Sequence, residues 1–474
     1  MSNPLLKKYN DINKARNKYG EIIKCEFHLH TPASHDYRLE KDMKYVDLSD
    51  EEVINIAFNN GYINTIQKDH FLDEIRQGLY ASKEYKLNLE SDGKPFSSLK
   101  EYMSYKLIAH RLFQENIQLV VVTDHNTIDG YDKLKYALIE YYIERYKGKE
   151  GAPGKISLIL GIEISCSEQV HLVGMFDTSM INSVRELINY YIPSHEGTYE
   201  TSYSILNKIS AMGGIGYIAH INSLSLKTTG LYKSTLFNDK NLYILGLTTS
   251  DVIEREKNKL IVYGVNDPEN KFCFINEGDA HELSQIGVNN TWIKISNPGF
   301  FALKRAFVNH KFCVYLEKPK KTNKYIKGIL IDPGTYGYLR KQHDSNDNNF
   351  NVNFSRDLNC IIGGRGTGKS TLLNILELLF TLETDSEDKL RFISKNKYII
   401  VLFVFNGNEY LLRFIPQVEE NSYSTGRSFF SPKAFIEYKP SQGKIVLQDH
   451  WVELYKVQKS GSNNIDFITI TNNC

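Results

Sequence analysis

The sequence predicts an α/β protein in which a barrel-like domain precedes a domain with a phosphate-binding loop, and three observations lead to this. Short apolar runs alternate with amphipathic stretches over the first two-thirds of the chain, which favours largely parallel strands joined by helices. Histidines and carboxylates stand at the ends of several of these runs. Nearer the C-terminus, a glycine-rich loop lies between an apolar run and a helical stretch, as phosphate-binding loops do.

The apolar runs of the first domain are numerous enough to close a barrel. The runs that we expect to be strands are Ile22–Phe27, Leu119–Thr123, Ile156–Ile164, His171–Phe176, Gly214–His220, Leu242–Leu247 and Phe272–Asn276. This domain is expected over residues 20–312, after an N-terminal extension of residues 1–19. A polar, lysine-rich stretch over residues 70–115 interrupts the alternation and is interpreted as an insertion.

The second domain is expected over residues 328–474, after a lysine-rich linker of residues 313–327. Its phosphate-binding loop should follow a strand at Leu358–Ile362 and open a helix at Ser370–Phe380. Two further apolar runs, Tyr398–Phe405 and Tyr410–Phe414, are separated by an Asn-Gly-containing turn and predict a β-hairpin.

Composition limits the classes of function. The 57 basic and 56 acidic side chains give a net charge of +1, so nothing global indicates a nucleic-acid binder. The 6 cysteines form no C-x-x-C pair, which is typical of reduced, cytoplasmic usage. The N-terminus lacks the apolar segment of a secretory signal, and no apolar run approaches the roughly 20 residues of a membrane span. We therefore expect a soluble cytoplasmic protein without a membrane partner.

Histidines and carboxylates at the run ends predict a metal centre. The C-terminal ends of parallel barrel strands converge on one face, so groups distant in sequence would meet there. The candidate ligands are His28, His30, Asp36, His125, Glu163, His171, His220, Asp279 and His281. Imidazole and carboxylate suit Zn²⁺, Mn²⁺ or Fe²⁺, and nine ligands suit two or three ions. Asp124 either orients a ligand or caps the following helix; His35 lies beside the ligands at most, and His195 and His310 receive no role.

The glycine-rich loop predicts ATP binding with Mg²⁺. Its residues are Gly363, Gly364, Arg365, Gly366, Thr367, Gly368, Lys369, Ser370 and Thr371, which fit G-x-x-x-x-G-K-[ST]. Backbone N–H groups would surround the phosphates, Lys369 would reach the β- and γ-phosphates and Ser370 would hold Mg²⁺.

Six motifs together resemble the PHP (polymerase and histidinol phosphatase) superfamily over residues 20 to about 310. They are H-x-H-T-P-x-S-x-D at 28–36, T-D-H-N at 123–126, G-I-E-I-S at 161–165, H-L-V-G at 171–174, A-H at 219–220 and G-D-A-H at 278–281. The resemblance implies a distorted (β/α)7 barrel with a di- or trinuclear centre that hydrolyses phosphoesters. It also implies that the nine residues above are ligands and that all but His171 act in catalysis. Asp36 stands where some members have histidine, and Ile221 where many have proline.

The segment N-F-x-x-x-L-N-C-I-I-G-G-R-G-T-G-K-S-T resembles the N-terminal lobe of SMC- and ABC-type ATPases. PHP domains fused directly to such an ATPase form a bacterial family to which this chain is similar over nearly its whole length. A Walker B strand and a signature motif are missing. This implies a truncated ATPase, or one half of an ATPase completed by a second chain, with homo-oligomers as another arrangement and slow ATP hydrolysis by the chain alone.

The leading functional expectation is a metal-dependent phosphoesterase, specifically a nuclease on DNA or RNA, that an ATP-binding domain regulates or targets. One alternative is a phosphatase or phosphoesterase for small molecules or nucleotides. Another is an ATP-binding regulatory scaffold without catalysis. The lysine-rich stretches Ser82–Lys106 and Lys318–Lys327 would either touch a nucleic-acid backbone or serve as solvated linkers.

Overall fold

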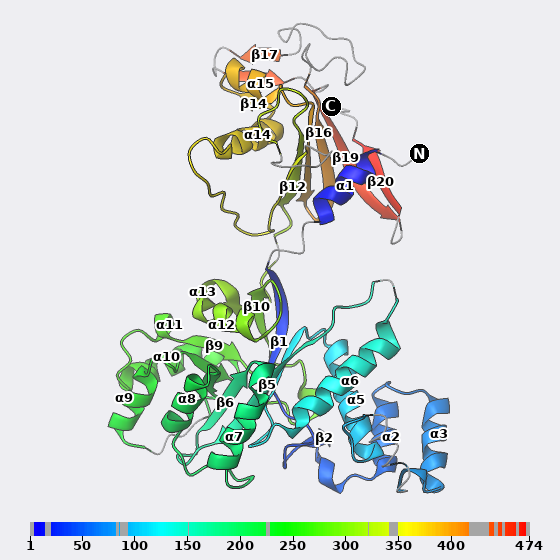
Figure 1. The fold of residues 1–474 in the computed structure, drawn as a ribbon, viewed down its shortest axis with the longest axis vertical. Helices are drawn as coiled ribbons and strands as arrows, with labels where there is room; N and C mark the ends of the chain where they lie inside the picture. The colour runs from blue at the N-terminus through cyan, green and yellow to red at the C-terminus, as the bar shows by residue number, and fades with distance from the viewer. Residues whose placement is uncertain are drawn as a thin grey trace. The chain divides into compact units, whose positions relative to one another are not determined.

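The chain forms two compact units in the computed structural model (Figure 1). The barrel unit is Gly20–Pro319, and the P-loop unit combines Met1–Tyr19 with Lys320–Cys474. The structure describes residues 4–14, 20–81, 85, 93–149, 151–223, 228–320, 322–340, 349–416, 436–439, 444–447, 451–460 and 464–470. Among these residues, no helix is both long enough and apolar enough to cross a bilayer.

The barrel unit is built on a nine-stranded sheet in the order β11-β10-β1-β4-β5-β6-β7-β8-β9. Its strands are β1 (Glu21–Leu29), β4 (Leu119–Val122), β5 (Ser157–Ser165), β6 (His171–Phe176), β7 (Ile215–Ile218), β8 (Ile244–Leu247), β9 (Cys273–Asn276), β10 (Thr291–Ile295) and β11 (Val314–Tyr315). The end strands β9 and β11 approach each other, so the sheet is nearly closed. One cluster of buried apolar side chains draws on eight of the strands and on α12 (Phe300–Val308), as a sheet curved around a common interior requires.

The sheet departs from a regular parallel barrel at β6. Strands β1, β4 and β5 run parallel, as do β7, β8 and β9, but β6 is antiparallel to both β5 and β7. The first residue of β6 therefore lies beside the last residues of its neighbours. For this reason His171, which opens its strand, reaches the same edge as residues that close theirs: it pairs with Ser165, and its carbonyl accepts from Ala219 N–H.

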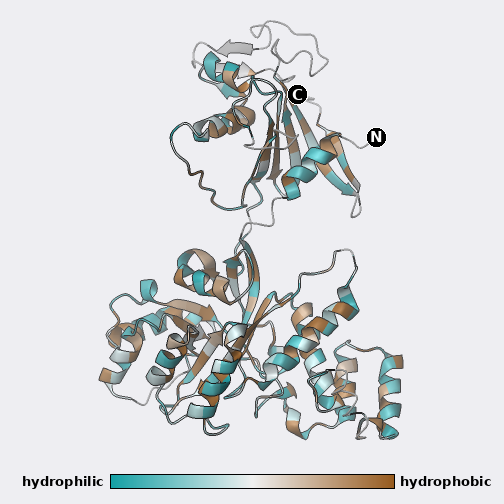
Figure 2. Cartoon of the chain, in the orientation of Figure 1, coloured by the Kyte–Doolittle hydropathy of each residue, from teal (hydrophilic) through white to brown (hydrophobic). Residues whose placement is uncertain are grey.

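Helices cover the outside of this sheet. They are α2 (Asp50–Asn59), α3 (Thr65–Arg76), α5 (Leu99–Gln114), α6 (Asp129–Tyr146), α7 (Ile181–Tyr191), α8 (Ser202–Ala211), α9 (Gly230–Asn238), α10 (Ile253–Val262), α11 (Pro268–Lys271), α12 and α13 (His310–Cys313), with a small hairpin of β2 (Arg38–Glu40) and β3 (Met43–Lys44). Figure 2 shows hydrophobic colour on the central strands and hydrophilic colour on much of the helical surface. Ser49 and Asn64 start α2 and α3 with complete capping boxes, which satisfy otherwise unpaired N–H groups.

Residues 70–115, interpreted from the sequence as an insertion, include a helix of the barrel unit's core. Helix α5 packs against α2 and α6, and twelve of its residues are buried. Among them is Lys106, whose ammonium group reaches Glu140 at 3.1 Å and Glu144 at 2.7 Å. This lysine can be buried because carboxylates on α6 neutralise it, and local composition cannot reveal such a contact.

The P-loop unit is built on a six-stranded antiparallel sheet in the order β13-β12-β15-β16-β19-β20. Its strands are β12 (Tyr325–Asp332), β13 (Phe350–Asn353), β15 (Tyr398–Phe405), β16 (Asn408–Phe414), β19 (Val452–Ser460) and β20 (Asn464–Thr469). A second, three-stranded sheet holds β14 (Glu383–Thr384), β17 (Ile436–Lys439) and β18 (Lys444–Leu447). Helices α14 (Lys369–Thr381) and α15 (Glu387–Ile393) contribute to its main apolar core, and the expected hairpin is β15–β16.

Three expectations for this unit need correction. The strand predicted at Leu358–Ile362 is absent, and Leu358 and Ile362 are 87% and 92% exposed. No strand among the described residues pairs with this segment, and an apolar run without a hydrogen-bonded neighbour does not form a sheet strand. The predicted linker 313–327 already contains β11 and the start of β12. The N-terminal extension contains α1 (Pro4–Lys14), which packs on β12 and β13.

Candidate metal centre

Backbone pairing brings the ends of the central strands to one place. A bridge joins His125 to Glu163 beyond β4, and another joins Leu29 to Ala280. His30 N–H donates to Ala280 O, so the end of β1 lies beside the segment that carries Asp279 and His281. These contacts, with the His171 pairing described above, assemble residues from six separate places in the sequence at the same edge of the sheet.

Glu163 lies at the middle of the resulting cluster. Five imidazole nitrogens approach its two carboxylate oxygens: His28 Nε2 at 3.2 Å, His30 Nε2 at 3.4 Å, His125 Nδ1 at 3.0 Å, His171 Nδ1 at 2.8 Å and His220 Nε2 at 3.4 Å. The first three face Oε2 and the last two face Oε1. Five imidazoles thus face one buried carboxylate.

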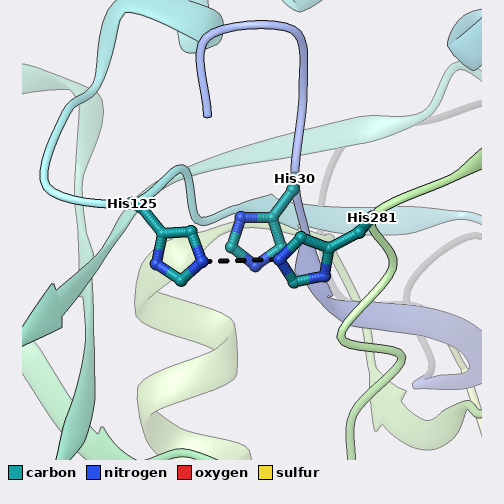
Figure 3. Close-up of side chains that lie close together, drawn as sticks. All are labelled: His30, His125 and His281. Carbon is teal, nitrogen blue, oxygen red and sulfur yellow. Dashed lines mark hydrogen bonds between the residues drawn. The ribbon is translucent and has the colours of Figure 1, made fainter. Parts of the chain in front are cut away.

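Asp279 and Asp36 extend this cluster on its more exposed side. Asp279 Oδ1 lies 3.5 Å from nitrogens of His28, His30 and His281. Asp36 Oδ2 lies 3.3 Å from His125 Nε2 and 3.2 Å from His281 Nε2. In Figure 3 the rings of His30, His125 and His281 gather together, with the 3.4 Å contact between His125 Nε2 and His281 Nε2 drawn. The structure therefore brings all nine sequence-predicted residues into one network.

The tautomers set by neighbouring groups leave lone pairs directed into the cluster. The Ser34 hydroxyl donates to Asp124 Oδ1, so its oxygen accepts from His30 Nδ1–H at 2.9 Å. His28 Nδ1 donates to Glu277 Oε2 at 3.1 Å, and His281 Nδ1 donates to the Asp279 carbonyl at 3.0 Å. In the neutral form of each ring, Nε2 is then the nitrogen without a proton, and this is the form that ligates a metal.

Several of the converging atoms are buried without a hydrogen-bond partner among the described residues. They are His28 Nε2, His30 Nε2, Asp36 Oδ1, His125 Nδ1 and Glu163 Oε2. Buried polar atoms are costly unless they are paired. All five can donate an electron pair, so a bound cation would satisfy them together. The donor atoms form three overlapping groups with internal spacing within 4.8 Å: His28, His30, Glu163 and Asp279; His30, His125 and His281; and His125, Glu163 and His171.

The pKa shifts in the cluster follow from burial and from this mixing of charges. Burial raises the pKa of Glu163, but the facing imidazoles outweigh it and hold that pKa well below its usual range. Burial opposes ionisation of Asp279 in the same way, yet His28 and His30 keep its pKa low. Burial and the nearby His281 lower the pKa of His30 to about 3, so this ring is neutral at physiological pH. The carboxylates are ionised and His30 is unprotonated, as metal ligation requires.

Asp124 contacts the segments that carry the predicted ligands, and among the described residues it forms no capping hydrogen bond with the following helix. Its Oδ1 accepts from Thr31 N–H at 2.6 Å and from the Ser34 hydroxyl at 3.0 Å, while Oδ2 accepts from the Thr31 hydroxyl at 2.8 Å. Ser34 in turn contacts His30 Nδ1 and accepts from His125 N–H. Residues Thr31, Ser34 and Asp124, here called the Asp124 cluster, therefore hold two ligand-bearing segments together. Burial raises the pKa of Asp124 to about 6 against these hydrogen bonds.

Sequence reasoning missed two buried acids behind the ligands. Glu277 accepts from His28 Nδ1–H and from His220 N–H, and such carboxylates commonly orient metal-binding imidazoles. Glu26 is fully buried, accepts from Gly287 N–H, and has a pKa that burial raises to about 8. Glu277 stands two residues before Asp279, and Glu26 stands two residues before His28. The spacings E-x-D-x-H and E-x-H-x-H were therefore the sequence signals that could have identified these acids.

Two exposed histidines lie beside the cluster. The His35 ring centroid is 5.3 Å from that of His125 and 5.7 Å from that of His195. Asn126, directly after a predicted ligand, donates to the His195 carbonyl at 2.9 Å and fixes that loop. The interpretation of His35 as a neighbour of the ligands fits this position, whereas nothing in the sequence placed His195 there.

The glycine-rich loop that the sequence predicts to bind phosphate lies at the start of α14. Gly366 and Gly368 have φ angles of +81° and +88°, a conformation that glycine adopts without strain. Lys369 Nζ donates to the carbonyls of Gly363 and Gly364, both at 2.6 Å, and the Tyr338 hydroxyl donates to Gly366 O. The loop and the helix N-terminus are in place, while the predicted strand before them is not.

Comparisons of the sequence with known proteins find a family model and a relative that match parts of the chain. A family model described as an AAA domain matches residues 341–469. An uncharacterized protein of Streptococcus pneumoniae serotype 4 is 29% identical over 249 residues, which cover 51% of this chain and 88% of the relative.

Among solved structures, likenesses are distant. The lesion-specific endonuclease PfuEndoQ from Pyrococcus furiosus aligns with a TM-score of 0.37 and 14% identity over 67% of this chain and 64% of its own. PsfC from Pseudomonas syringae PB-5123 aligns with a TM-score of 0.28 and 13% identity over 41% of this chain and 73% of its own. This chain thus spans less than two-thirds of the length of PfuEndoQ. Because the TM-scores are low, the site is described from the residues of this chain and not from these structures.

Proposed function

We propose that this chain is a metal-dependent phosphoesterase that cleaves phosphodiesters of DNA or RNA and carries an ATP-binding domain. One observation carries the proposal: five imidazole nitrogens surround both oxygens of the buried Glu163 carboxylate. Five buried donor atoms there lack a hydrogen-bond partner among the described residues. Mixed imidazole and carboxylate sites of this kind suit Zn²⁺, Mn²⁺ or Fe²⁺.

Two or three ions fit the donor set better than one. The three groups of donor atoms overlap in His30, His125 and Glu163. A neutral imidazole offers one lone pair, so the nine donors would be divided between neighbouring ions. When bound, such ions polarise a phosphoryl oxygen, supply an activated water at neutral pH and offset the charge on the leaving group. The proposed ligands are His28, His30, Asp36, His125, Glu163, His171, His220, Asp279 and His281; all but His171 are proposed to act in catalysis.

The exposure of the side chains indicates where a substrate approaches. His28, His30 and Glu163 are fully buried at the base of the cluster, whereas the side chains of Asp36 and Asp279 are 42% and 32% exposed. A phosphoester therefore reaches the side of Asp36 and Asp279, and the buried side chains hold the site rigid beneath it. The exposed His35 and His195 border this same region.

The nucleic-acid substrate is supported by resemblance to ATPases that act on DNA, and only weakly by the lysine-rich stretches. Lys106 is buried against two carboxylates. Lys100 donates to backbone carbonyls of Tyr45, Val46 and Leu48. Lys327 is buried and pairs with Glu409 at 2.5 Å. The ammonium groups of these three lysines bind partners within the chain, so these lysines are not candidates for contact with a nucleic-acid backbone.

The proposed ATP site is the loop Gly363–Thr371 with Mg²⁺ at Ser370, and the AAA-domain match over residues 341–469 supports it. Lys369 now contacts loop carbonyls; with ATP bound it would turn to the β- and γ-phosphates. Regulation or targeting of the phosphoesterase by this domain, completion of the ATPase by a second chain, and homo-oligomer formation are parts of the same proposal.

A chelation experiment tests the phosphoesterase. The full chain is assayed on bis(p-nitrophenyl) phosphate and on labelled single-stranded DNA and RNA, after EDTA treatment and after addition of Mn²⁺ or Zn²⁺. We expect EDTA to abolish cleavage and the metals to restore it. The double variant Asp279→Ala/His281→Ala should stay inactive with metal, while His70→Ala, on an exposed face of α3, should match the native chain. Full activity of the double variant would overturn the proposal.

A further inference from the structure

A basic cavity lies in the barrel unit at the other ends of the strands from the metal centre. Its volume is about 420 Å³ and its lining includes Lys240, Lys271, Lys304, Tyr243, Phe307 and His310. Tyr243 directly precedes β8, and Lys271 lies two residues before β9. Ile215, the first residue of β7, also lines the cavity. The metal-site residues His220 and Asp279 follow the opposite ends of β7 and β9. Four strand residues span about 13 Å, so the cavity is separate from the metal centre.

The two half-buried ammonium groups of this cavity have unused donors. Lys271 Nζ donates to Asp239 O and Lys304 Nζ donates to Gly213 O, each at 3.0 Å. An ammonium group has three donors, so each retains two. Neither lysine forms an ion pair with a carboxylate among the described residues. The nearby Asp239 carboxylate instead accepts from Asn241 N–H, although its charge partly offsets the burial that lowers the pKa of Lys271.

The rest of the lining is fixed and carries no acid. Ser210 donates to Asn241 Oδ1, and Asn241 donates to Asn207 Oδ1, which holds one wall in place. The His310 ring nitrogens contact the backbone carbonyls of Phe307 and Glu269. No aspartate or glutamate is among the lining residues. Partly buried cations without a carboxylate in direct contact are unfavourable, so the cavity suits an anion.

We propose that this cavity binds the phosphate group of a small phosphorylated molecule, held by Lys271 and Lys304. A phosphate oxygen can accept a short, charge-assisted hydrogen bond from each ammonium group, and lysine acts as a point charge toward phosphate. A volume of about 420 Å³ falls within the range of about 300–1,000 Å³ typical of small-molecule sites. Buried Phe307 and half-buried Tyr243 provide an apolar wall beside the phosphate for the rest of the ligand. This site does not depend on the phosphoesterase proposal.

Affinity labelling of the native full chain tests the site. The probe is pyridoxal 5′-phosphate, whose aldehyde condenses with a lysine amine, releasing water; borohydride then reduces the imine to a stable amine that mass spectrometry locates. The matched control is pyridoxal, which has the same aldehyde without the phosphate. We expect Lys271 or Lys304 to be modified at roughly tenfold lower concentration of pyridoxal 5′-phosphate than of pyridoxal, because charge-assisted bonds to phosphate favour the complex.

Competition identifies the recognised group. Inorganic phosphate and AMP should each protect Lys271 and Lys304, while succinate at the same concentration should not. The exposed lysines Lys41 and Lys395 lie outside the cavity lining and report on general reactivity. None of the three competitors should protect them. Equal labelling by pyridoxal and pyridoxal 5′-phosphate, no protection by phosphate, or equal protection by succinate would each overturn the proposal. Because no variant is needed, loss of folding cannot mimic a result.

Discussion

Replacing Gly130 with alanine should destabilise the barrel unit and weaken metal binding, although Gly130 is not a ligand. A Cβ atom at this position would lie 2.1 Å from Asp124 Oδ2 and 2.2 Å from Thr31 Oγ1, well inside van der Waals contact. The side chain can fit only if the Asp124 cluster moves by more than 1 Å, roughly the gap to an ordinary contact. Its hydrogen bonds of 2.6, 2.8 and 3.0 Å then cannot all persist.

The magnitude follows from these contacts. Overpacking a rigid site costs about 1–3 kcal/mol, and each lost hydrogen bond to the Asp124 carboxylate costs about 1.5–3 kcal/mol. Alanine in a helix returns about 0.5–1 kcal/mol relative to glycine. With one bond lost, the net destabilisation is about 2–5 kcal/mol. Displacement of Ser34 and Asp124, which orient His30 and His125, should weaken metal binding about 10- to 100-fold.

A second helix-start glycine provides the control. Gly230 opens α9, and a Cβ there meets nothing within 4 Å, so Gly230→Ala should be neutral or slightly stabilising. Because the chain has two units, unfolding is followed by urea-dependent hydrogen exchange in peptides covering Leu119–Val122, which reports on the barrel unit alone. Zinc affinity is measured by competition with a chromophoric chelator. Equal exchange and equal zinc affinity for the two variants would refute the role given to the Asp124 cluster.

Three further predictions concern proton competition, the acid behind the ligands and the ATP site. Burial lowers the pKa values of His28, His125, His220 and His281, but the facing carboxylates outweigh burial and raise these pKa values above about 6.5. Because a ligating imidazole must lose its proton, zinc affinity should fall as pH falls, beginning above about pH 6.5. A zinc affinity that rises on acidification would contradict this prediction. Glu277→Gln should weaken zinc binding about 10- to 100-fold, because Glu277 orients His28. The matched control is Glu269→Gln, which changes an exposed acid. Equal zinc affinities of the two variants would argue against the orienting role of Glu277. Lys369→Ala should weaken ATP binding, measured by calorimetry, and should leave EDTA-sensitive phosphoesterase activity intact, because the two sites lie in different units. The native chain alone should hydrolyse ATP slowly, and rapid ATP turnover would show that a hydrolytic carboxylate was overlooked.

Much of the site could be predicted because ligand chemistry and strand ends coincide in the sequence. The motifs around His28, His125 and Glu163 each close an apolar run, and parallel strands bring such ends to one edge. His171 was the exception, since it opens a run. Only the antiparallel pairing of β6 explains its place, and strand direction is not encoded in hydrophobic periodicity.

Other features depend on contacts that local sequence does not contain. Glu26 and Glu277 are acids inside otherwise apolar strand ends, and their partners Gly287 and His28 are more than two hundred residues away. Helix α5 belongs to the core through its apolar side chains, and its buried Lys106 is neutralised across a helix pair. The apolar run Leu358–Ile362 resembles a strand by composition, but a strand also needs a hydrogen-bonded neighbour, and none is found among the described residues.

Metal content tests the central claim most directly. The full chain is purified without chelator, loaded with Zn²⁺ or Mn²⁺, separated from free metal, and analysed by plasma mass spectrometry beside Asp279→Ala/His281→Ala and His70→Ala. The donor groups around Glu163 predict two or three ions per chain in the native protein and in His70→Ala, and fewer in the double variant. A native chain that retains no metal, or as much metal in the double variant as in the native chain, would contradict the account.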